Sequence, residues 1–477
     1  MSKLIKGFLI VGIEKALYML IQLLSIVILA RLISPEEYGI IGIAVIFTSL
    51  SSLLIDSGMG GSLVYHKDSD KKDFSTIFWF NLCIAVIVYI ILFSISGLVA
   101  DFYNIPILKI IIRVSALSVV FTSFGFTQLN KLTKELQFKK LAEVNIIAYA
   151  IATIIAIILA VLKLGVWALV MQQLLHSCIK TILLFFYAKF LPEFYFSKPL
   201  LKKHFFFGSS LMLSSFLKTI YDNTYAFVLG KWMSVSTVGY FNQAKRVQDI
   251  PYQFTGTILD QATFPIMSKI EDDNDFYNTA RKIIRTIFIL FFPILMIMSL
   301  CSSEIITILL GKEWIPSAPI LVGLTFGTLA LLGEAVNRNF IKARGATKLI
   351  FKLEFFKKTG AIVLVIVFMY WGIYGLIASF IINALIAYIC NAWGTGNVSL
   401  YTVKKQSSDF VYCFLMSFIP YLITYFIFIQ LNCLDDIISL VSKSLLYLVL
   451  YIAILIFSNN NEFIIIKNRI IDIRKRL

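Results

Sequence analysis

The chain has 477 residues, of which 59% are hydrophobic and 15% charged, and its mean hydropathy is +0.86. Soluble domains are about half apolar and about a quarter charged, so this composition excludes an ordinary soluble protein. The net charge of +16 does not indicate nucleic acid as a partner, because the basic residues are scattered over short loops. A membrane protein with no nucleic-acid partner is predicted.

Fourteen apolar segments follow one another along the chain. Each has about 20 or more residues, which at about 1.5 Å per residue is enough to cross a hydrocarbon core of roughly 30 Å. Turns as short as Lys163–Leu164 or Gly372 require neighbouring helices to be antiparallel. The sequence therefore predicts an all-α membrane protein with 14 transmembrane helices, at residues 7–31, 40–64, 75–99, 107–129, 141–162, 165–189, 204–231, 238–267, 283–308, 316–341, 350–371, 373–393, 409–431 and 439–458.

Lys and Arg are concentrated in every second loop. Most of the 43 basic residues lie at the termini or in the loops after the second, fourth, sixth, eighth, tenth and twelfth segments. Short loops rich in Lys and Arg stay in the cytoplasm. The pattern predicts a multi-pass protein of the cytoplasmic membrane, in contact with membrane lipids, with both termini inside. Seven basic residues belong to the other loops or their edges: Arg31, Lys109, Arg113, Lys163, Lys231, Lys312 and Lys443.

The cysteines and histidines are dispersed. None of the six cysteines forms a CxxC pair, and His66, His176 and His204 are far apart in the sequence. Neither a disulfide framework nor a metal site is predicted, and no cofactor is expected. We expect the histidines to be loop and packing residues.

Two pairs of short sequences are similar at nearly the same offset. Residues 28–39, ILARLISPEEYG, are similar to residues 228–239, VLGKWMSVSTVG, and residues 165–170, GVWALV, to residues 372–377, GIYGLI. Both pairs lie on the predicted outer side, so the two halves would share one orientation, as in transporters with parallel repeats. Chance similarity between short turns is the alternative. We expect three parts: a six-helix lobe at 1–200, a second six-helix lobe at 201–400, and the last two spans with a cytoplasmic tail at 401–477.

Ionisable residues inside the spans are the candidates for function, because burying them in a membrane is costly. Three pairs stand four residues apart, so each pair shares a helix face and can neutralise itself. Structural ties between helices are the alternative for any one pair. The set as a whole has a surplus of positive charge, which favours a water-filled cavity for an anion, and both Arg and Lys suit phosphate. The pairs are Lys218/Asp222, Lys245/Asp249 and Glu334/Arg338, and the predicted substrate-binding cations are Lys218, Lys245, Arg246 and Arg338.

Carboxylates in the spans have a second use. Burial raises the pKa of a carboxyl group and a nearby cation lowers it, so a change between the two environments can bind or release H+ or Na+. Asp222 and Glu334 are the leading candidates for this ion coupling, followed by Asp56. At Asp56 the following glycines, in DSGMGG at 56–61, favour close helix packing instead.

A resemblance to a known family rests on three stretches: LARLISPEEYG at 29–39, DSGMG at 56–60 and GKWMSVSTVGYFNQAKR at 230–246. These resemble bacterial polysaccharide flippases, in the polysaccharide transporter branch of the multidrug/oligosaccharidyl-lipid/polysaccharide superfamily. The resemblance covers nearly the whole chain and implies a twelve-helix, V-shaped core with two further helices. It also implies transfer of an undecaprenyl-pyrophosphate-linked oligosaccharide to the outer leaflet, with polysaccharide assembly proteins as partners. The family's cationic cavity carries over in general onto Lys218, Arg246 and Arg338.

Two other functions compete with a flippase. A multidrug or small-solute antiporter of the same superfamily would favour an acidic cavity for cationic drugs, whereas the charges inside these spans are mostly basic. A polysaccharide polymerase or glycosyltransferase would need an extramembrane active site, but the outer loops, around 302–317 and 431–439, are short and contain no acid/base set. The acidic run at 271–275 is interpreted as a solvated loop. A non-enzyme is expected.

Overall fold

The computed structural model describes residues 3–56, 58–259, 263–429 and 435–458. Within these ranges the side chains of 3–16, and of 210, 211, 213, 214, 217, 218, 254, 257 and 258, are not described. The described residues form helices and short connections without a strand, which confirms the predicted all-α class.

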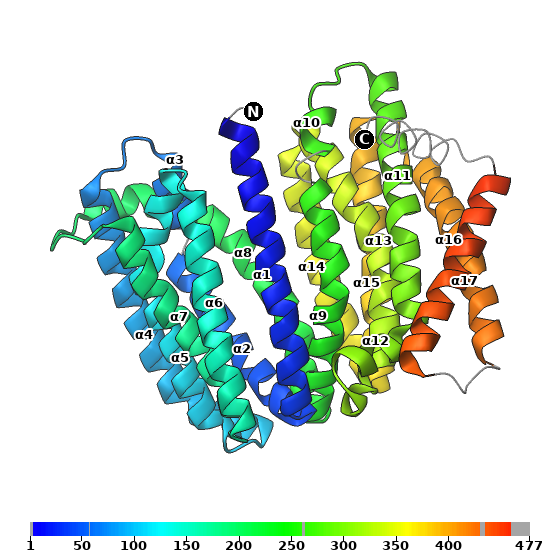
Figure 1. Ribbon diagram of the computed structural model, residues 1–477. Coiled ribbons are helices and arrows are strands. Elements are labelled where there is room, and N and C mark those ends of the chain that lie inside the picture. The colour runs from blue at the N-terminus through cyan, green and yellow to red at the C-terminus, as the bar shows by residue number, and fades with distance from the viewer. Residues whose placement is uncertain (1–2, 57, 260–262, 430–434, 459–477) are drawn as a thin grey trace. The chain divides into compact units, whose positions relative to one another are not determined.

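Long helices follow one another with short connections (Figure 1). Their bounds, together with those of the short helices between them, are α1 Lys3–Leu32, α2 Pro35–Asp56, α3 Met59–Tyr65, α4 Lys71–Tyr103, α5 Leu108–Lys134, α6 Phe138–Val161, α7 Val166–Ala188, α8 Lys198–Trp232, α9 Val235–Ile258, α10 Phe264–Met267, α11 Asp273–Leu300, α12 Ser302–Leu309, η2 Lys312–Trp314, α13 Ser317–Ala343, α14 Thr347–Phe368, η3 Met369–Trp371, α15 Gly372–Val398, α16 Val403–Ile429 and α17 Asp436–Phe457.

Among the described residues, ten helical stretches are long and apolar enough to cross a membrane. One of them, Thr347–Val398, includes both α14 and α15. α8 and α9 are not among the ten, although both are longer than 20 residues. Polar and charged residues interrupt their apolar sequence, as in Lys218, Asp222, Lys245 and Arg246. The chain is therefore a multi-pass helical protein, and the number of 14 spans stays a prediction.

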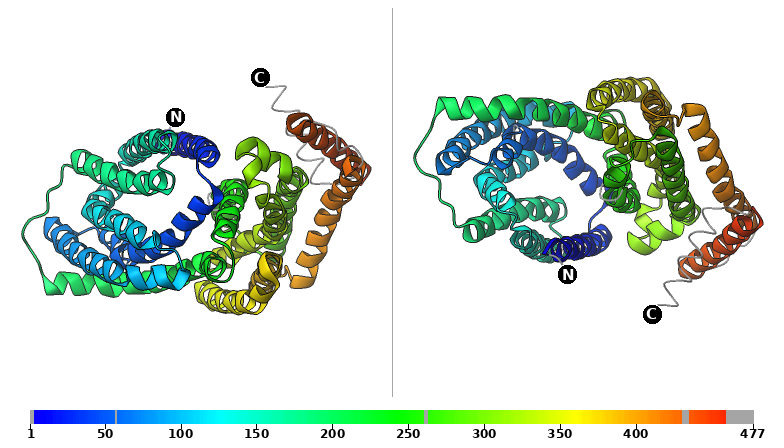
Figure 2. Two further views of the ribbon diagram at one scale, coloured as in Figure 1. Left: turned by 90° about the horizontal axis from the view of Figure 1, so that it is seen from below. Right: turned by 90° about the horizontal axis from the view of Figure 1, so that it is seen from above.

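The chain divides into two compact units, Met1–Gly239 and Tyr240–Leu477. In Figure 2 most helices of each unit are viewed along their axes. In the second unit, α16 and α17 lie at one side and pack on α11 (Figure 2). The expected division into 1–200, 201–400 and 401–477 stays a prediction.

The turn between α1 and α2 has its counterpart between α8 and α9. Ser34 Oγ donates to Glu37 Oε2 over 3.0 Å at the start of α2. At the start of α9, Ser234 Oγ lies 2.7 Å from Thr237 Oγ1. Each serine hydroxyl also accepts from a backbone nitrogen, Ser34 Oγ from Glu37 N over 3.4 Å and Ser234 Oγ from Thr237 N over 3.3 Å, which satisfies an unpaired N–H at the start of the helix.

The two turns also pack against each other inside the first unit. A Cβ on Gly39 would overlap the Val235 carbonyl oxygen, and a Cβ on Gly239 would overlap the Pro35 carbonyl oxygen. Pro35 corresponds to Val235 and Gly39 to Gly239 at the offset of 200 residues, so the contact is reciprocal. Reciprocal contacts of this kind are the mark of a two-fold relation.

Candidate functional site

Glu334 on α13 is the centre of a buried ion network in the second unit. Its Oε1 accepts hydrogen bonds from Lys357 Nζ on α14 and from Asn391 Nδ2 on α15, each over 2.8 Å. The Lys357 ammonium also donates to Glu354 Oε1 over 2.6 Å and to Asn391 Oδ1 over 3.1 Å. Three helices are therefore joined through one carboxylate.

Close packing of α13 and α15 brings Asn391 within reach of Glu334. A Cβ on Gly333 would lie 2.6 Å from the Tyr388 ring of α15, so only glycine permits this approach. Asn391 Nδ2 can then donate to the Glu334 backbone carbonyl over 3.1 Å as well as to its carboxylate. Gly333 thus lets α15 approach α13 closely enough for Asn391, about one turn after Tyr388, to reach Glu334.

The network places charge deep in the protein. The side chains of Glu334 and Lys357 are 7% and 5% exposed, whereas the Glu354 side chain is 32% exposed. Hydrogen bonds between ionised groups are short and strong, and they offset the cost of removing the charges from water. The Lys357 ammonium is paired with two carboxylates, those of Glu334 and Glu354, so one further cation is needed for the group to be neutral.

Arg338 supplies that cation at the exposed edge of the network. Its Nη1 lies 3.9 Å from Glu334 Oε1, which confirms that the predicted pair shares a helix face, and its side chain is 43% exposed. Tyr252 on α9 interacts electrostatically with both Glu334 and Arg338. The edge of the network therefore lies within electrostatic range of Tyr252 on α9.

The other predicted site residues lie on α9, on α8 and at the end of α2. On α9, Lys245 is half-buried and Arg246 is exposed. In the first unit, Asp222 on α8 and Asp56 at the end of α2 are both exposed. The side chain of Lys218 lies outside the described residues. Beyond Asp56, a Cβ on Gly58 would overlap the backbone of Gly208 on α8, so this segment packs closely as the glycines predict.

Lys357, Glu354 and Asn391 were missed in the sequence. The alternation of loop charge groups the lysines near the start of the eleventh segment with those of the cytoplasmic loop before it, although Lys357 lies within that segment and is buried inside α14. The spacing of Glu354 and Lys357, three apart within a predicted span, was the available signal. Asn391 gives no such signal, because a single asparagine in an apolar helix does not reveal its partner.

A second buried carboxylate, Asp409 on α16, ties the last helices to the second unit. Arg281 on α11 holds it through two nitrogens, with Nε 2.9 Å from Oδ2 and Nη2 3.0 Å from Oδ1. The hydroxyl of Tyr401, in the connection before α16, donates to Oδ2 over 2.8 Å. This arrangement joins α11 to the first turns of α16.

A Ser–His–Asp contact in the first unit is structural. His204 Nδ1 lies 2.8 Å from Ser62 Oγ, and His204 Nε2 lies 2.8 Å from Asp73 Oδ1. A hydrolytic triad uses the ring nitrogens the other way round and needs an accessible nucleophile. Ser62 and His204 are fully buried, so these side chains join α3, α4 and α8. The expectation of a packing role is met at His204.

The acidic run at 271–275 caps the start of α11 and forms an ion pair with the residue that follows α13. Asp272 Oδ1 accepts from the backbone nitrogens of Asn274 and Asp275 at the start of α11, over 2.9 and 2.8 Å. Asp273 pairs with Arg344 over 2.5 Å. Within the described residues, no group of three or more His, Cys, Asp or Glu side chains could hold a metal ion.

Comparisons with known proteins agree with the architecture. The lipopolysaccharide biosynthesis protein WzxC of Escherichia coli K12 is 24% identical over 70% of this chain and 69% of its own length. The teichuronic acid biosynthesis protein TuaB of Bacillus subtilis 168 is 24% identical over the same shares of the two chains. The fold matches that of a lipid II flippase, MurJ, in its inward closed conformation, with a TM-score of 0.75 at 16% identity, over 94% of this chain and 99% of that one.

The family model described as "polysaccharide biosynthesis protein" matches residues 28–319. This range includes the three stretches that carry the resemblance to polysaccharide flippases. The chain belongs to the polysaccharide biosynthesis protein family.

Proposed function

We propose that this protein moves an oligosaccharide linked to undecaprenyl pyrophosphate from the inner to the outer leaflet of the cytoplasmic membrane, for the synthesis of cell-surface polysaccharide. Membership of the polysaccharide biosynthesis protein family is the observation that carries this proposal. The likeness of almost the whole fold to a lipid flippase supports a transport mechanism. Alternating access would expose the cargo first to one side of the membrane and then to the other.

The diphosphate of such a cargo needs cations in a low-dielectric setting. Arg246 and Arg338 offer guanidinium groups, which bind phosphate oxygens in pairs, and Lys245 offers a point charge. Arg338 is anchored beside Glu334 and partly exposed, so it can meet an anion without leaving its helix face. Lys218, Lys245, Arg246 and Arg338 are the proposed contacts of the diphosphate.

Ion coupling is part of the proposal. Glu334 is enclosed by Lys357 and Asn391, so protonation of Glu334 would release these two partners and loosen α14 and α15 from α13. Asp222 and Asp56 are exposed and could exchange H+ or Na+ with water directly. Transport that depends on a gradient of either ion is expected, with Asp222 and Glu334 as the leading residues.

The proposed orientation has both termini in the cytoplasm and two lobes related by a parallel repeat. The reciprocal packing of Gly39 on Val235 and of Gly239 on Pro35 supports this relation. Cysteines introduced at Ser34 and Ser234 should therefore both react with a membrane-impermeant maleimide added to intact cells. Labelling of one site alone would disprove the parallel repeat, and Cys433, which lies between the last two predicted spans, is replaced first to remove its signal.

Reconstituted protein tests the function. Proteoliposomes containing the wild-type chain should transfer radiolabelled undecaprenyl-pyrophosphate-linked oligosaccharide between leaflets, whereas a cationic dye should not be moved. An imposed H+ or Na+ gradient should accelerate the transfer. Dye transport without transfer of the lipid-linked sugar would favour a multidrug or small-solute antiporter instead.

A further inference from the structure

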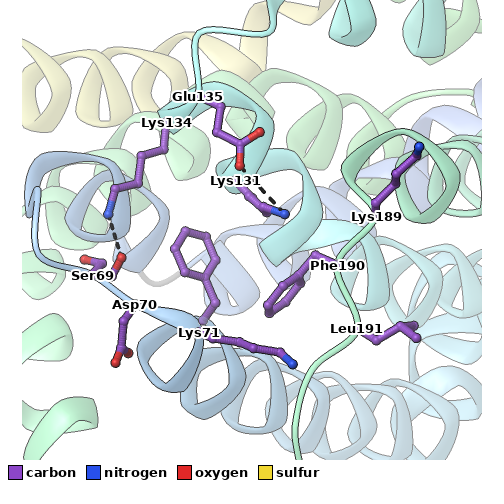
Figure 3. A pocket seen from close by; sticks show the side chains of 10 residues that line it. Ser69, Asp70, Lys71, Lys131, Lys134, Glu135, Lys189, Phe190 and Leu191 are labelled. Carbon is purple, nitrogen blue, oxygen red and sulfur yellow. Dashed lines mark hydrogen bonds and ion pairs between the residues drawn. The ribbon is translucent and has the colours of Figure 1, made fainter.

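A pocket lined by lysines lies at the end of the first unit where three loops meet (Figure 3). Its volume is about 720 Å³, within the range of about 300–1,000 Å³ that small-molecule sites occupy. We call it the lysine pocket. Its lining residues are Ser69, Asp70, Lys71, Phe74, Lys131, Lys134, Glu135, Lys189, Phe190 and Leu191.

Two of the lysines are held in place by backbone carbonyls. Lys134 Nζ donates to the carbonyls of His66 and Ser69, each over 2.9 Å. Lys131 Nζ donates to the Ala188 carbonyl over 3.0 Å. An ammonium group has three donors, so these bonds orient the two side chains without using all their hydrogens.

The pocket has an excess of positive charge. Four lysines line it against two carboxylates, Asp70 and Glu135. Asp70 is engaged as the cap of α4, because its Oδ1 accepts from Lys72 N and Asp73 N over 2.9 and 3.1 Å. Glu135 Oε1 lies 3.7 Å from Lys131 Nζ. The residual charge favours an anionic ligand.

Figure 3 shows that Lys71 and Lys131 extend toward the Phe190 ring, whereas Lys189 points away from the other lysines. Lys71 Nζ pairs with Glu193 Oε1 over 3.0 Å, but both side chains are about half exposed. An exposed pair contributes little and exchanges readily. Lys71 can therefore turn to a ligand at small cost.

Exposed aromatic and apolar residues next to the pocket are typical of a membrane surface. Phe194 is 96% exposed and stacks on Trp79 with their ring centroids 5.0 Å apart, and Leu191 is 72% exposed. Tryptophan is enriched at membrane–water interfaces, where its ring lies at the depth of the lipid headgroups. The three loops of the pocket are also among those that the charge pattern assigns to the cytoplasmic side.

We propose that the lysine pocket binds a phosphate group. Lysines on a membrane surface attract phosphate-bearing headgroups, and the exposed Leu191 and Phe194 can contact the adjoining acyl chains. An anionic phospholipid of the inner leaflet fits both features, whereas a free phosphate anion would use the lysines alone. This proposal is independent of the transported cargo and of the Glu334 network.

Binding is tested with the purified full-length chain by native mass spectrometry. Phosphatidylglycerol, phosphatidylcholine and inorganic diphosphate are titrated separately, and diphosphate is then added against phosphatidylglycerol. The substitution Lys71→Gln/Lys131→Gln should weaken phosphatidylglycerol binding on the order of 30-fold, because each lysine near an anionic lipid contributes about a factor of five. Phosphatidylcholine should bind more weakly than phosphatidylglycerol.

Two further variants separate binding from folding. Lys71→Gln/Lys189→Gln leaves the bonds of Lys131 and Lys134 to the backbone intact and should still weaken binding. Lys139→Gln/Lys198→Gln removes the same charge from the same unit outside the pocket, and should bind like the wild type.

The outcomes identify the source of the phosphate. Lysine-dependent binding of phosphatidylglycerol that diphosphate does not displace assigns the pocket to a lipid headgroup. Lysine-dependent binding of diphosphate, with no preference between the two lipids, assigns it to a free anion. Equal weakening by the pocket variants and by Lys139→Gln/Lys198→Gln would overturn the proposal, as would binding that none of them changes.

Discussion

Two buried carboxylates of the second unit, Glu334 and Asp409, are held in different ways. The guanidinium fork of Arg281, about two turns into α11, and the hydroxyl of Tyr401, in the connection before α16, hold Asp409. Glu334 lies inside α13, where a lysine and an asparagine hold one oxygen and Arg338 lies farther off at 3.9 Å. Both carboxylates are almost fully buried.

The difference separates a structural tie from a candidate for function. A bidentate Arg–carboxylate pair fixes geometry, which suits the attachment of α16 to α11. Lysine has a flexible stem and a point charge, so the partners around Glu334 can rearrange more easily. Arg281 and Arg338 are similarly exposed, at 44% and 43% of their side chains, so the distinction rests on the type of partner and on the interaction of the Glu334 network with Tyr252 of α9.

The largest effect is expected when one partner of the Glu334–Lys357 pair is removed. Glu334→Gln or Lys357→Gln leaves a buried charge without its main partner and should lower the free energy of unfolding by about 3–5 kcal/mol. The double variant Glu334→Gln/Lys357→Gln removes both charges and should recover much of this loss. Thermal unfolding in detergent measures all three.

The double variant also separates stability from coupling. If the pair is a coupling site, the folded double variant should lose the dependence of transport on an ion gradient. A double variant that is as stable as the wild type and still responds to the gradient would make the Glu334 network a structural tie like that of Asp409.

A smaller effect is expected at Asp409. Arg281→Lys keeps the charge but loses the fork, so the free energy of unfolding should fall by about 1.5–3 kcal/mol, the value of one charged hydrogen bond. Transport by the folded protein should be unchanged. The neighbouring change Lys282→Ala removes an exposed charge and should alter stability by about 0.5 kcal/mol or less. Loss of transport in stable Arg281→Lys protein would contradict a purely structural role.

The smallest effect depends on pH and concerns Glu304 on α12. Burial raises the pKa of this carboxyl, but hydrogen bonds from Lys443 and Ser439 outweigh it and hold the pKa below its usual range. The pair therefore stabilises the protein above a pH of about 4.3, and this contribution is lost as the pH falls through the folded-state pKa.

Lys443→Gln should accordingly lower the melting temperature at pH 7, and the difference from the wild type should shrink as the pH falls below about 4. Lys443→Arg keeps the charge and serves as the control. A deficit that is the same at both pH values would mean that Lys443 acts by packing and not by charge.

Much of the fold could be predicted from the sequence, because membrane helices are read from local properties. Length, apolar composition and turns such as Lys163–Leu164 locate helices without knowledge of their partners. The echo between residues 28–39 and 228–239 also drew attention to Gly39 and Gly239, whose reciprocal contact the structure shows. The polar sequences of α8 and α9 give the weakest signal for a span, because the charges that suggest function also lower the hydropathy of these helices.

The candidate site was predicted only in part. Glu334 and Arg338 were found because their spacing lies within one helix. Lys357 lies within the predicted span 350–371, but the charge pattern groups it with the cations of the preceding loop, since that pattern cannot tell a lysine at a helix end from one that reaches inward to a carboxylate. Asn391 and Asp409 acquire their roles from helices far away in the sequence, which a single sequence does not reveal.

Transport by charge variants tests the central claim most directly. In proteoliposomes, Arg338→Ala and Arg246→Ala should each reduce transfer of the lipid-linked oligosaccharide at least about tenfold, because each removes a charged hydrogen bond of about 1.5–3 kcal/mol to the diphosphate. Lys282→Ala should transport like the wild type. Normal transfer by both arginine variants, at equal protein levels, would contradict the claim that these cations bind the diphosphate.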